Sequence, residues 1–379
     1  MQKFSKVILP FLEEEKYDYT CIFENFNFSI HKKVHQQLEN EKNSEQIKEC
    51  RAQDQFEIKE TMQLQSGTIL HKAIDVKNNQ IVSLAIYRDV EEPENEKNDD
   101  INEMVFLPKL KHQNILKFCD VVVGSDIEIL AFSFESHHSL LSTVIDERVD
   151  LLYEAHVIKN IMHQLFKGLD YLHRKSVIHR DIHPDNILFT STGVLKIWNL
   201  RNARWMNQRK GEVKTFEYRY QPIELILEFE TCTTAVDIWS AGCIFAQLLQ
   251  KKILFPMYER ESVLSQIFAL LGFPTQKIYK ELYAYELLID LLKYLGHHYN
   301  CLDIHMKNNC PEACTVPVLN LLHSCLLYNP KDRLTADQCL HHEYFYTGPA
   351  ACPPEDIVKI LEASNINKNL RQFKNKKAL

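Results

Sequence analysis

Four soft side chains stand close together in the stretch CLDIHMKNNCPEAC, which runs from residue 301 to residue 314. Thiolates and a neutral imidazole are ligands that Zn²⁺ prefers, and this stretch supplies Cys301, His305, Cys310 and Cys314. The gaps between them lack the close C-x2-C pairs that mark strong zinc motifs. The pattern therefore indicates a weak zinc candidate, and a loop with reduced thiols is the alternative.

A second group of polar residues has the types needed for acid–base or magnesium chemistry. The stretch VIHRDIHPDNILF, residues 177–189, contains Asp181 and Asn186, and the stretch GVLKIWNL, residues 193–200, contains Asn199. A carboxylate can accept a proton from a reacting group. Mg²⁺ prefers charged oxygen ligands, and the two asparagines supply only neutral amide oxygens. By residue type alone, Asp181 is a candidate base, and neutral amide oxygens are weak ligands for Mg²⁺.

Composition sets the background for these groups. The 379 residues are 45% apolar and 25% charged, with a net charge of −7, which is typical of a globular protein and argues against a nucleic-acid footprint over the whole chain. Eleven cysteines lack even spacing, and there is neither a signal peptide nor an apolar run of about 18 residues. We expect an intracellular protein, cytoplasmic or nuclear or both, that binds neither membrane nor nucleic acid.

The elements that must position the chemistry change type along the chain. Two β-type runs, QIVSLAIY at 80–87 and IEILAFSF at 127–134, flank a stretch with helical spacing at 101–107. After residue 140 the pattern becomes helical, as in AVDIWSAGCIFAQLLQ and in an apolar stripe at three- and four-residue intervals: Val157, Ile158, Ile161, Met162, Leu165, Leu169 and Leu172. This predicts an α+β protein with a small strand-rich lobe containing one main helix and a larger helical lobe.

That order of elements, together with one loop, resembles the bilobal protein kinase fold. His179-Arg180-Asp181 followed by Asn186 matches the kinase H-R-D-x-x-x-x-N loop. The motifs LFP, LLGFPT and NPKDRLTADQCLHHEYF follow in the right order and are similar to those of the cyclin-dependent-kinase branch. The resemblance implies an N-terminal extension at 1–55, a kinase-like domain at 56–347 with lobes at about 56–135 and 136–347, and a tail at 348–379.

The same resemblance shows losses in the nucleotide site. Family glycines that let the backbone approach phosphates correspond to Gln63, Gln65 and Thr68. The family's third-strand lysine corresponds to Ala85, with Lys72 and Arg88 as neighbouring cations that could replace it. Glu103 matches the glutamate that pairs with that lysine, so we expect it to find another cation, such as Arg88 or Arg201, or to face solvent.

The metal and catalytic positions are altered too. Asn199-Leu200-Arg201 stands against the family's Asp-Phe-Gly, and His183 replaces the lysine of the catalytic loop. The activation segment places Lys210 or Glu212 where the family carries a phosphorylated threonine, so no switching by phosphorylation is expected there. The resemblance gives the remaining matches structural roles: His179, Arg180, Asp181, Asn186, Asp237 and the ion pair of Glu224 with Arg333.

The resemblance with these losses predicts a pseudokinase that acts as a scaffold or regulatory interaction module. We expect it to need no cofactor and to bind a protein partner, such as a cyclin-like or other regulatory subunit. The alternative is an atypical or weakly active cyclin-dependent-kinase-like serine/threonine kinase that uses ATP and Mg²⁺. A basic tail, INKNLRQFKNKKAL, could contact an acidic partner or remain solvated.

Overall fold

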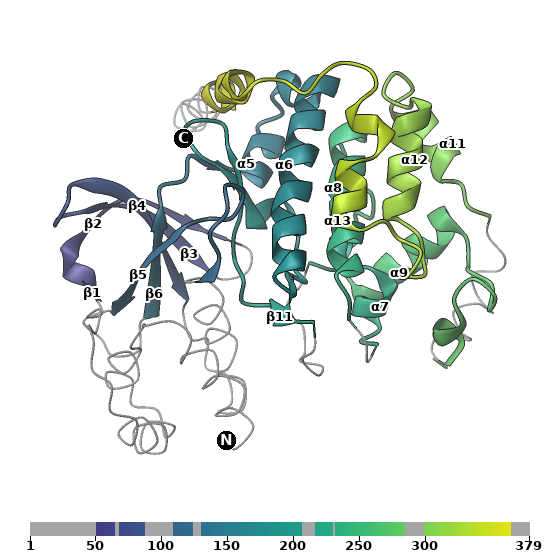
Figure 1. Cartoon of the computed structure of the whole chain (residues 1–379), viewed down its shortest axis with the longest axis horizontal. Helices are drawn as coiled ribbons and strands as arrows, with labels where there is room; N and C mark the ends of the chain where they lie inside the picture. The colour runs from purple at the N-terminus through teal and green to yellow at the C-terminus, as the bar shows by residue number, and fades with distance from the viewer. Residues whose placement is uncertain are drawn as a thin grey trace, which may run out of the picture. The chain divides into compact units, whose positions relative to one another are not determined.

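The computed structural model describes residues 51–64, 68–87, 109–123, 130–206, 217–229, 232–284 and 299–364. These fall into two compact units, one within Met1–Lys111 and Leu116–His137, the other within His112–Ile115 and His138–Leu379. The first unit is built on a β-sheet and the second is mainly helical (Figure 1), as the α+β prediction requires. The predicted helix at 101–107 lies outside the described residues.

The first unit contains a six-stranded sheet whose order is β1-β5-β6-β4-β3-β2. Strand β3 pairs antiparallel with β2 and with β4, its neighbours in sequence, because only a few residues separate these strands along the chain. The first strand is parallel to β5 and lies in the predicted N-terminal extension. The strands are β1 (Arg51–Ala52), β2 (Phe56–Gln63), β3 (Ile69–Asp75), β4 (Gln80–Tyr87), β5 (Phe118–Val123) and β6 (Leu130–Glu135).

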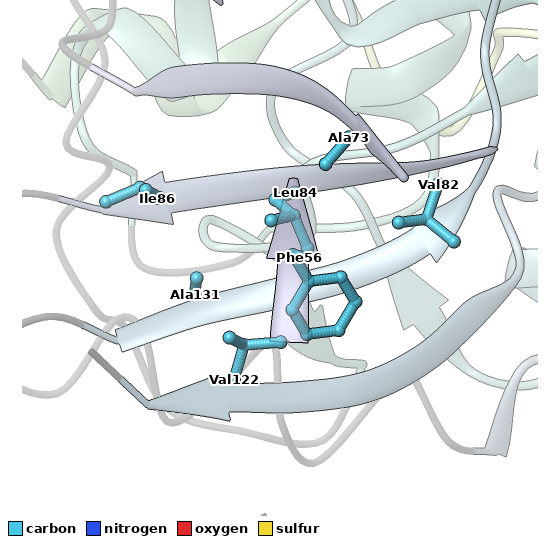
Figure 2. Close-up of a cluster of buried hydrophobic side chains, with 7 residues drawn as sticks. All are labelled: Phe56, Ala73, Val82, Leu84, Ile86, Val122 and Ala131. Carbon is cyan, nitrogen blue, oxygen red and sulfur yellow. The ribbon is translucent and has the colours of Figure 1, made fainter. Parts of the chain in front are cut away.

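One face of this sheet is covered by an apolar cluster. Because side chains alternate between faces, strand β4 contributes Val82, Leu84 and Ile86 to the cluster and turns Ser83 and Ala85 to the other face. Figure 2 shows the cluster members, which come from five strands: Phe56, Ala73, Val82, Leu84, Ile86, Val122 and Ala131. The sheet therefore presents a packed apolar face and a second face that contains Ala85.

The second unit is organised around two long helices, α6 (Ala155–Arg174) and α8 (Ala235–Gln250), which pack together (Figure 1). Every residue of α8 is buried, which explains why its sequence is apolar almost all round. The other helices are α5 (Leu141–Asp146), α7 (Ile223–Ile226), α9 (Arg260–Leu271), α11 (Leu302–Asn309), α12 (Val316–Cys325) and α13 (Ala336–Leu340). Among the described residues, no helix is long and apolar enough to span a membrane.

Short strands in the second unit hold the loop that carries Asp181. Strand β9 (Ile187–Phe189) pairs antiparallel with β10 (Leu195–Ile197) and with β7 (Ser139–Leu140). Strand β8 (Val177–Ile178) pairs with β11 (Arg204–Trp205). Single turns of 3-10 helix occur at Pro184–Asn186 and at Asp150–Tyr153, Tyr218–Tyr220, Lys280–Ala284 and Glu343–Phe345, and in the first unit at Gln53–Gln55. The loop is thus framed by two short ladders.

The segment after residue 346 packs against α6 and the β9–β10 turn. The backbone N–H of Cys352 donates to the carbonyl of His156 at 3.0 Å, and the Asn160 side chain donates to the Cys352 carbonyl at 2.8 Å. Residues 354–364 are helical and bury Ile357, Ile360 and Leu361. The predicted tail therefore begins with a packed segment, and residues 365–379 lie outside the described residues.

Candidate functional site

A hairpin brings the two asparagines of the predicted metal site together. Ile187 pairs with Ile197 at the open end of β9–β10, so Asn186, just before β9, meets the chain that continues from β10 to Asn199. The backbone N–H of Trp198 donates to the Asn186 carbonyl at 3.2 Å, which extends this pairing by one step. The side-chain amide of Asn199 then donates to Asn186 Oδ1 at 2.9 Å.

Asp237, in the first turn of α8, holds the loop that carries Asp181. Its carboxylate is fully buried and accepts the backbone N–H groups of His179 at 3.0 Å and Arg180 at 2.8 Å. His173 Nε2 lies 2.8 Å from the same carboxylate. Two backbone donors and one ring nitrogen compensate the buried charge, and they hold Arg180 in a left-handed conformation with φ 68°. Asp237 therefore determines the path of the chain immediately before Asp181.

Asp181 is buried and its carboxylate is surrounded by side chains of the same unit. Oδ2 accepts hydrogen bonds from the amides of Asn186 at 3.0 Å and Asn202 at 3.2 Å, while Oδ1 faces His183 Nε2 at 3.6 Å. Asn202 was not identified from the sequence, because nothing in the string RNAR distinguishes an amide that folds back onto Asp181. Both oxygens of the candidate base are therefore engaged with neighbouring groups.

His183 is the one titratable side chain among these neighbours of Asp181. Burial is the largest single influence on the pKa of His183 and lowers it, but the charge and hydrogen bond of Asp181, together with the charges of Asp185 and Glu217, raise the pKa above its usual value. The Asn186 amide nitrogen lies 2.7 Å from Nε2 and also donates to the Asp181 carbonyl at 2.7 Å. In the neutral ring Nε2 accepts from Asn186, and after protonation the Nε2–H must turn toward Asp181.

Asn199 leaves one polar atom without a partner. Its Oδ1 is buried and has no hydrogen-bond partner among the described residues, although its amide nitrogen donates to Asn186. The residue has a φ of 63°, a left-handed conformation that asparagine tolerates better than most residues. The unit therefore holds Asn199 in place through backbone geometry and one amide–amide hydrogen bond.

The predicted ion pair lies deeper in the second unit. Arg333 donates to both oxygens of Glu224, at 2.5 and 3.0 Å, and also to the carbonyls of Leu327, Ala235 and Tyr328. The two side chains are 0% and 2% exposed, so each charge depends on the other. The guanidinium also stacks over the Trp239 ring, 4.9 Å from its centroid.

In the first unit, Ala85 is fully buried and pairs with Leu70 on β3 and Phe132 on β6. Directly opposite residues share a face, and the face alternates along a strand, so Lys72, opposite Ser83, lies on the same face as Ala85. Lys72 is half-buried. Lys72 therefore lies on the same sheet face as Ala85, two residues along β3 from Leu70, the residue directly opposite Ala85.

The other predicted nucleotide-site residues are only partly described. Thr68 is buried, and its carbonyl accepts the backbone N–H of Leu64 at 2.9 Å, which joins the end of β2 to the start of β3. Gln63 ends strand β2. Four residues lie outside the described residues: Gln65, Arg88, Glu103 and Glu212. Lys210 lies outside them as well.

The weak zinc candidate is not assembled as a group. His305 Nε2 lies 2.9 Å from Gln250 Oε1, and Cys301 Sγ donates to the Tyr299 carbonyl. The sulfurs of Cys310 and Cys314 do meet, 3.7 Å apart. In the part of the chain that the structure describes, no three cysteine, histidine or acidic side chains are placed to hold a metal ion. His305 on α11 therefore faces Gln250, whereas Cys310 and Cys314 face each other.

A family model described as "Protein kinase domain" matches residues 30–345. The chain belongs to the protein kinase family. Cyclin-dependent kinase 11 of Dictyostelium discoideum is 31% identical over 314 residues, which cover 80% of this chain and 84% of that protein. Cyclin-dependent kinase 10 of Homo sapiens is 31% identical over 310 residues, covering 81% and 84%. These relatives place the chain in the cyclin-dependent-kinase-like branch.

A solved structure supports the same fold. The crystal structure of the yeast RNA Pol II CTD kinase CTDK-1 complex contains a chain that superposes with a TM-score of 0.68, covering 82% of this chain and 99% of that one. The identity is 24%, so this likeness concerns the fold. A β-sheet unit and a helical unit in this order are therefore the two lobes of a protein kinase domain.

The residues present do not fit the magnesium that kinases use. In this family Mg²⁺ is held by the aspartate of Asp-Phe-Gly and by the catalytic-loop asparagine, positions that the sequence match predicts to be Asn199 and Asn186 here. The Asn186 oxygen is occupied by the Asn199 amide nitrogen, and the oxygen that remains, Asn199 Oδ1, is neutral. Because Mg²⁺ dehydrates reluctantly and prefers charged oxygen ligands, the neutral amide of Asn199 is a poor replacement for a carboxylate.

Proposed function

We propose that this protein is a catalytically impaired, cyclin-dependent-kinase-like protein that acts as a regulatory interaction module. The hydrogen bond from Asn199 to Asn186 carries the proposal, because it joins the two positions that a kinase bridges with Mg²⁺. An amide that donates a hydrogen bond where a cation should bind stabilises the loop without metal. The loop can therefore keep its conformation while losing the ion that neutralises the transferred phosphate.

The size of the expected loss follows from the missing charges. Removing one preorganised charge-stabilising group costs roughly 10²–10³ in rate. The third-strand lysine and the metal carboxylate are both absent, at Ala85 and Asn199. Starting from about 1–100 per second for a kinase, two independent losses leave roughly 10⁻⁶–10⁻² per second. Turnover of that order is too slow for efficient signalling by phosphoryl transfer.

Asp181 supports the same reading through its surroundings. A general base must accept the proton of the substrate hydroxyl, yet Oδ2 of Asp181 already accepts from Asn186 and Asn202. The His183 ring on the other side adds a group that competes for the carboxylate charge. We infer that Asp181 organises the loop in this protein.

The partner we propose is a cyclin-like regulatory subunit. The proteins named cyclin-dependent kinase 10 of Homo sapiens and Rattus norvegicus carry cyclin dependence in their names and match 81% and 82% of this chain. A protein of this branch that no longer transfers phosphate efficiently would still present the surfaces of its fold to such a subunit. We propose that it works inside the cell, in the cytoplasm, the nucleus or both.

The second candidate is a working serine/threonine kinase that uses ATP and Mg²⁺. Two observations favour it: the matched relatives are named as kinases, and Lys72 lies on the same sheet face as Ala85. A lysine displaced from β4 to β3 could serve the phosphates from a neighbouring position. On this reading the altered residues at the metal site lower the rate without abolishing it.

Phosphoryl transfer by the purified full chain separates the two candidates. The protein, alone and co-purified with each cyclin-like protein of its source, is incubated with labelled ATP, Mg²⁺ and a generic basic substrate. We expect a stable complex with one of these subunits and label incorporation that the Asp181→Asn substitution does not change. Failure of every cyclin-like protein to co-elute would remove that partner class.

Incorporation that Asp181→Asn abolishes would establish the working kinase in place of the proposal. In that case Lys72→Met tests whether Lys72 is the replacement lysine. The rate of phosphoryl transfer should fall if Lys72 contacts the phosphates and stay unchanged if it does not. Lys77→Met is the matched control, since Lys77 is exposed in the turn after β3 and leaves the Ala85 face unchanged.

A further inference from the structure

Two cysteines meet on the turn that connects α11 to α12. Cys310 caps the end of α11, and its backbone N–H donates to the Met306 carbonyl at 2.8 Å. The chain then turns tightly, with the Ala313 N–H donating to the Cys310 carbonyl at 3.1 Å. This turn brings Cys314 back, so that the two sulfurs lie 3.7 Å apart and both side chains are half-buried.

The surroundings distinguish the two thiols. Cys310 Sγ lies 3.2 Å from the Met306 carbonyl, so its S–H has a fixed acceptor. Burial raises the pKa of Cys310 to about 12, and burial also raises the pKa of Cys314. The contact with the Cys310 thiol and the charge of Lys307 oppose that rise in the pKa of Cys314, while Asp303 adds to it. Cys314 is therefore the easier of the two to ionise.

Access separates this pair from the other cysteines that the structure describes. Cys325 and Cys339 also interact through their side chains, but both are fully buried in the helical unit. Cys301 is half-buried and donates to a backbone carbonyl. Proximity and partial exposure coincide at residues 310 and 314.

We propose that Cys310 and Cys314 form a reversible intramolecular disulfide, a modification site that is independent of the kinase-like function. A disulfide needs an S–S distance of about 2.05 Å, so the sulfurs must approach by roughly 1.7 Å from their present separation. The turn is exposed at Glu312 and carries no strand pairing that would resist this movement. The bond would tie the end of α11 to the start of α12.

The oxidant that we propose for this cysteine pair is a peroxide. The Cys314 thiolate attacks one peroxide oxygen, the S–O bond forms as the O–O bond breaks, and the leaving hydroxide takes a proton to become water. Cys310 then loses its proton and attacks the Cys314 sulfur, the S–S bond forms, and the S–O bond breaks to release a second water. Each sulfur loses one electron, and the peroxide gains two.

The test uses the folded full chain, hydrogen peroxide and mass spectrometry after two proteases. Cleavage after Lys307, Glu312 and Lys331 places Cys310 in the fragment NNCPE and Cys314 in the fragment that follows. We expect these fragments to remain linked after oxidation, with a loss of 2 Da, and to separate after reduction by dithiothreitol. Fragment sequencing separates Cys314 from Cys325 in the second fragment.

Substitutions assign the roles of the two thiols. Cys310→Ser should stop the reaction at a sulfenic acid on Cys314, which dimedone captures, whereas Cys314→Ser should leave Cys310 at least tenfold slower to oxidise. Cys301→Ser is the matched control and should leave the linked fragments unchanged. Linkage of Cys325 to Cys339 at an equal rate, a dimer joined between chains, or oxidation of Cys301 ahead of the pair would each overturn the proposal.

Discussion

Replacing Asn199 by aspartate tests whether the amide hydrogen bond stands in for a metal ion. The substitution keeps the side-chain shape but removes the N–H donor that lies 2.9 Å from Asn186 Oδ1. A carboxylate oxygen would then face Asn186 Oδ1, and neither atom can donate a hydrogen bond. Asn186 is not free to turn its amide around, because its nitrogen donates to the Asp181 carbonyl at 2.7 Å and to Oδ2 at 3.0 Å. The new carboxylate would be buried at a site that is 4% exposed.

The magnitude follows from that burial. An uncompensated buried charge costs about 3–5 kcal/mol of unfolding free energy. At roughly 2–4 °C per kcal/mol for a unit of this size, the melting temperature of Asn199→Asp should fall by about 6–20 °C without divalent ions. Mg²⁺ at about 100 times its dissociation constant returns roughly 2.7 kcal/mol, or about 5–11 °C. The wild-type chain should show no shift with Mg²⁺.

The assay is a thermal melt of both proteins with and without MgCl₂, at constant ionic strength. Asn78→Asp is the matched control, because it adds the same charge in an exposed turn where the side-chain oxygen already accepts the Gln80 N–H at 3.0 Å. The reasoning fails if Mg²⁺ raises the melting temperature of the wild-type chain as much as that of Asn199→Asp. It fails equally if Asn199→Asp melts like the control in the absence of metal.

Three further predictions test the scaffold around the site. Arg333→Ala should lower the unfolding free energy by about 3–5 kcal/mol, because it leaves Glu224 as a buried, unpaired charge; an unchanged urea midpoint would contradict this. Gly193→Ala should cost more than Gly348→Ala in the same assay, since both have positive φ but only the Cβ at 193 would lie 2.5 Å from a backbone oxygen of the C-terminal segment; equal losses would show that this contact is unimportant. The pKa of His183 is raised in the folded protein, so its contribution to stability is complete below about pH 6.5 and is lost as pH rises through the folded value. The stability difference between wild type and His183→Gln should therefore be larger at pH 6 than at pH 8.5, and a difference that grows with pH would reverse the assignment.

Local sequence pattern alone was enough to predict several of the described elements. The alternation in residues 80–87 predicted a strand that the structure has as Gln80–Tyr87, and the apolar stripe predicted the helix Ala155–Arg174. The match of Ala85 and Asn199 to lost kinase positions depends on the flanking motifs that set the alignment, and it stays a prediction. Elements are predictable in this way because side-chain periodicity is a property of neighbouring residues.

Only the tertiary structure decided which side chains contact one another around Asp181 and on the sheet face of Ala85. The Asn199–Asn186 hydrogen bond depends on the register of β9 and β10, and the contact of Asn202 with Asp181 joins residues 21 positions apart along the chain. Strand register likewise placed Lys72 on the face of Ala85. Spacing along the sequence cannot specify such meetings, because they depend on how separate elements pair and on which way each side chain then points.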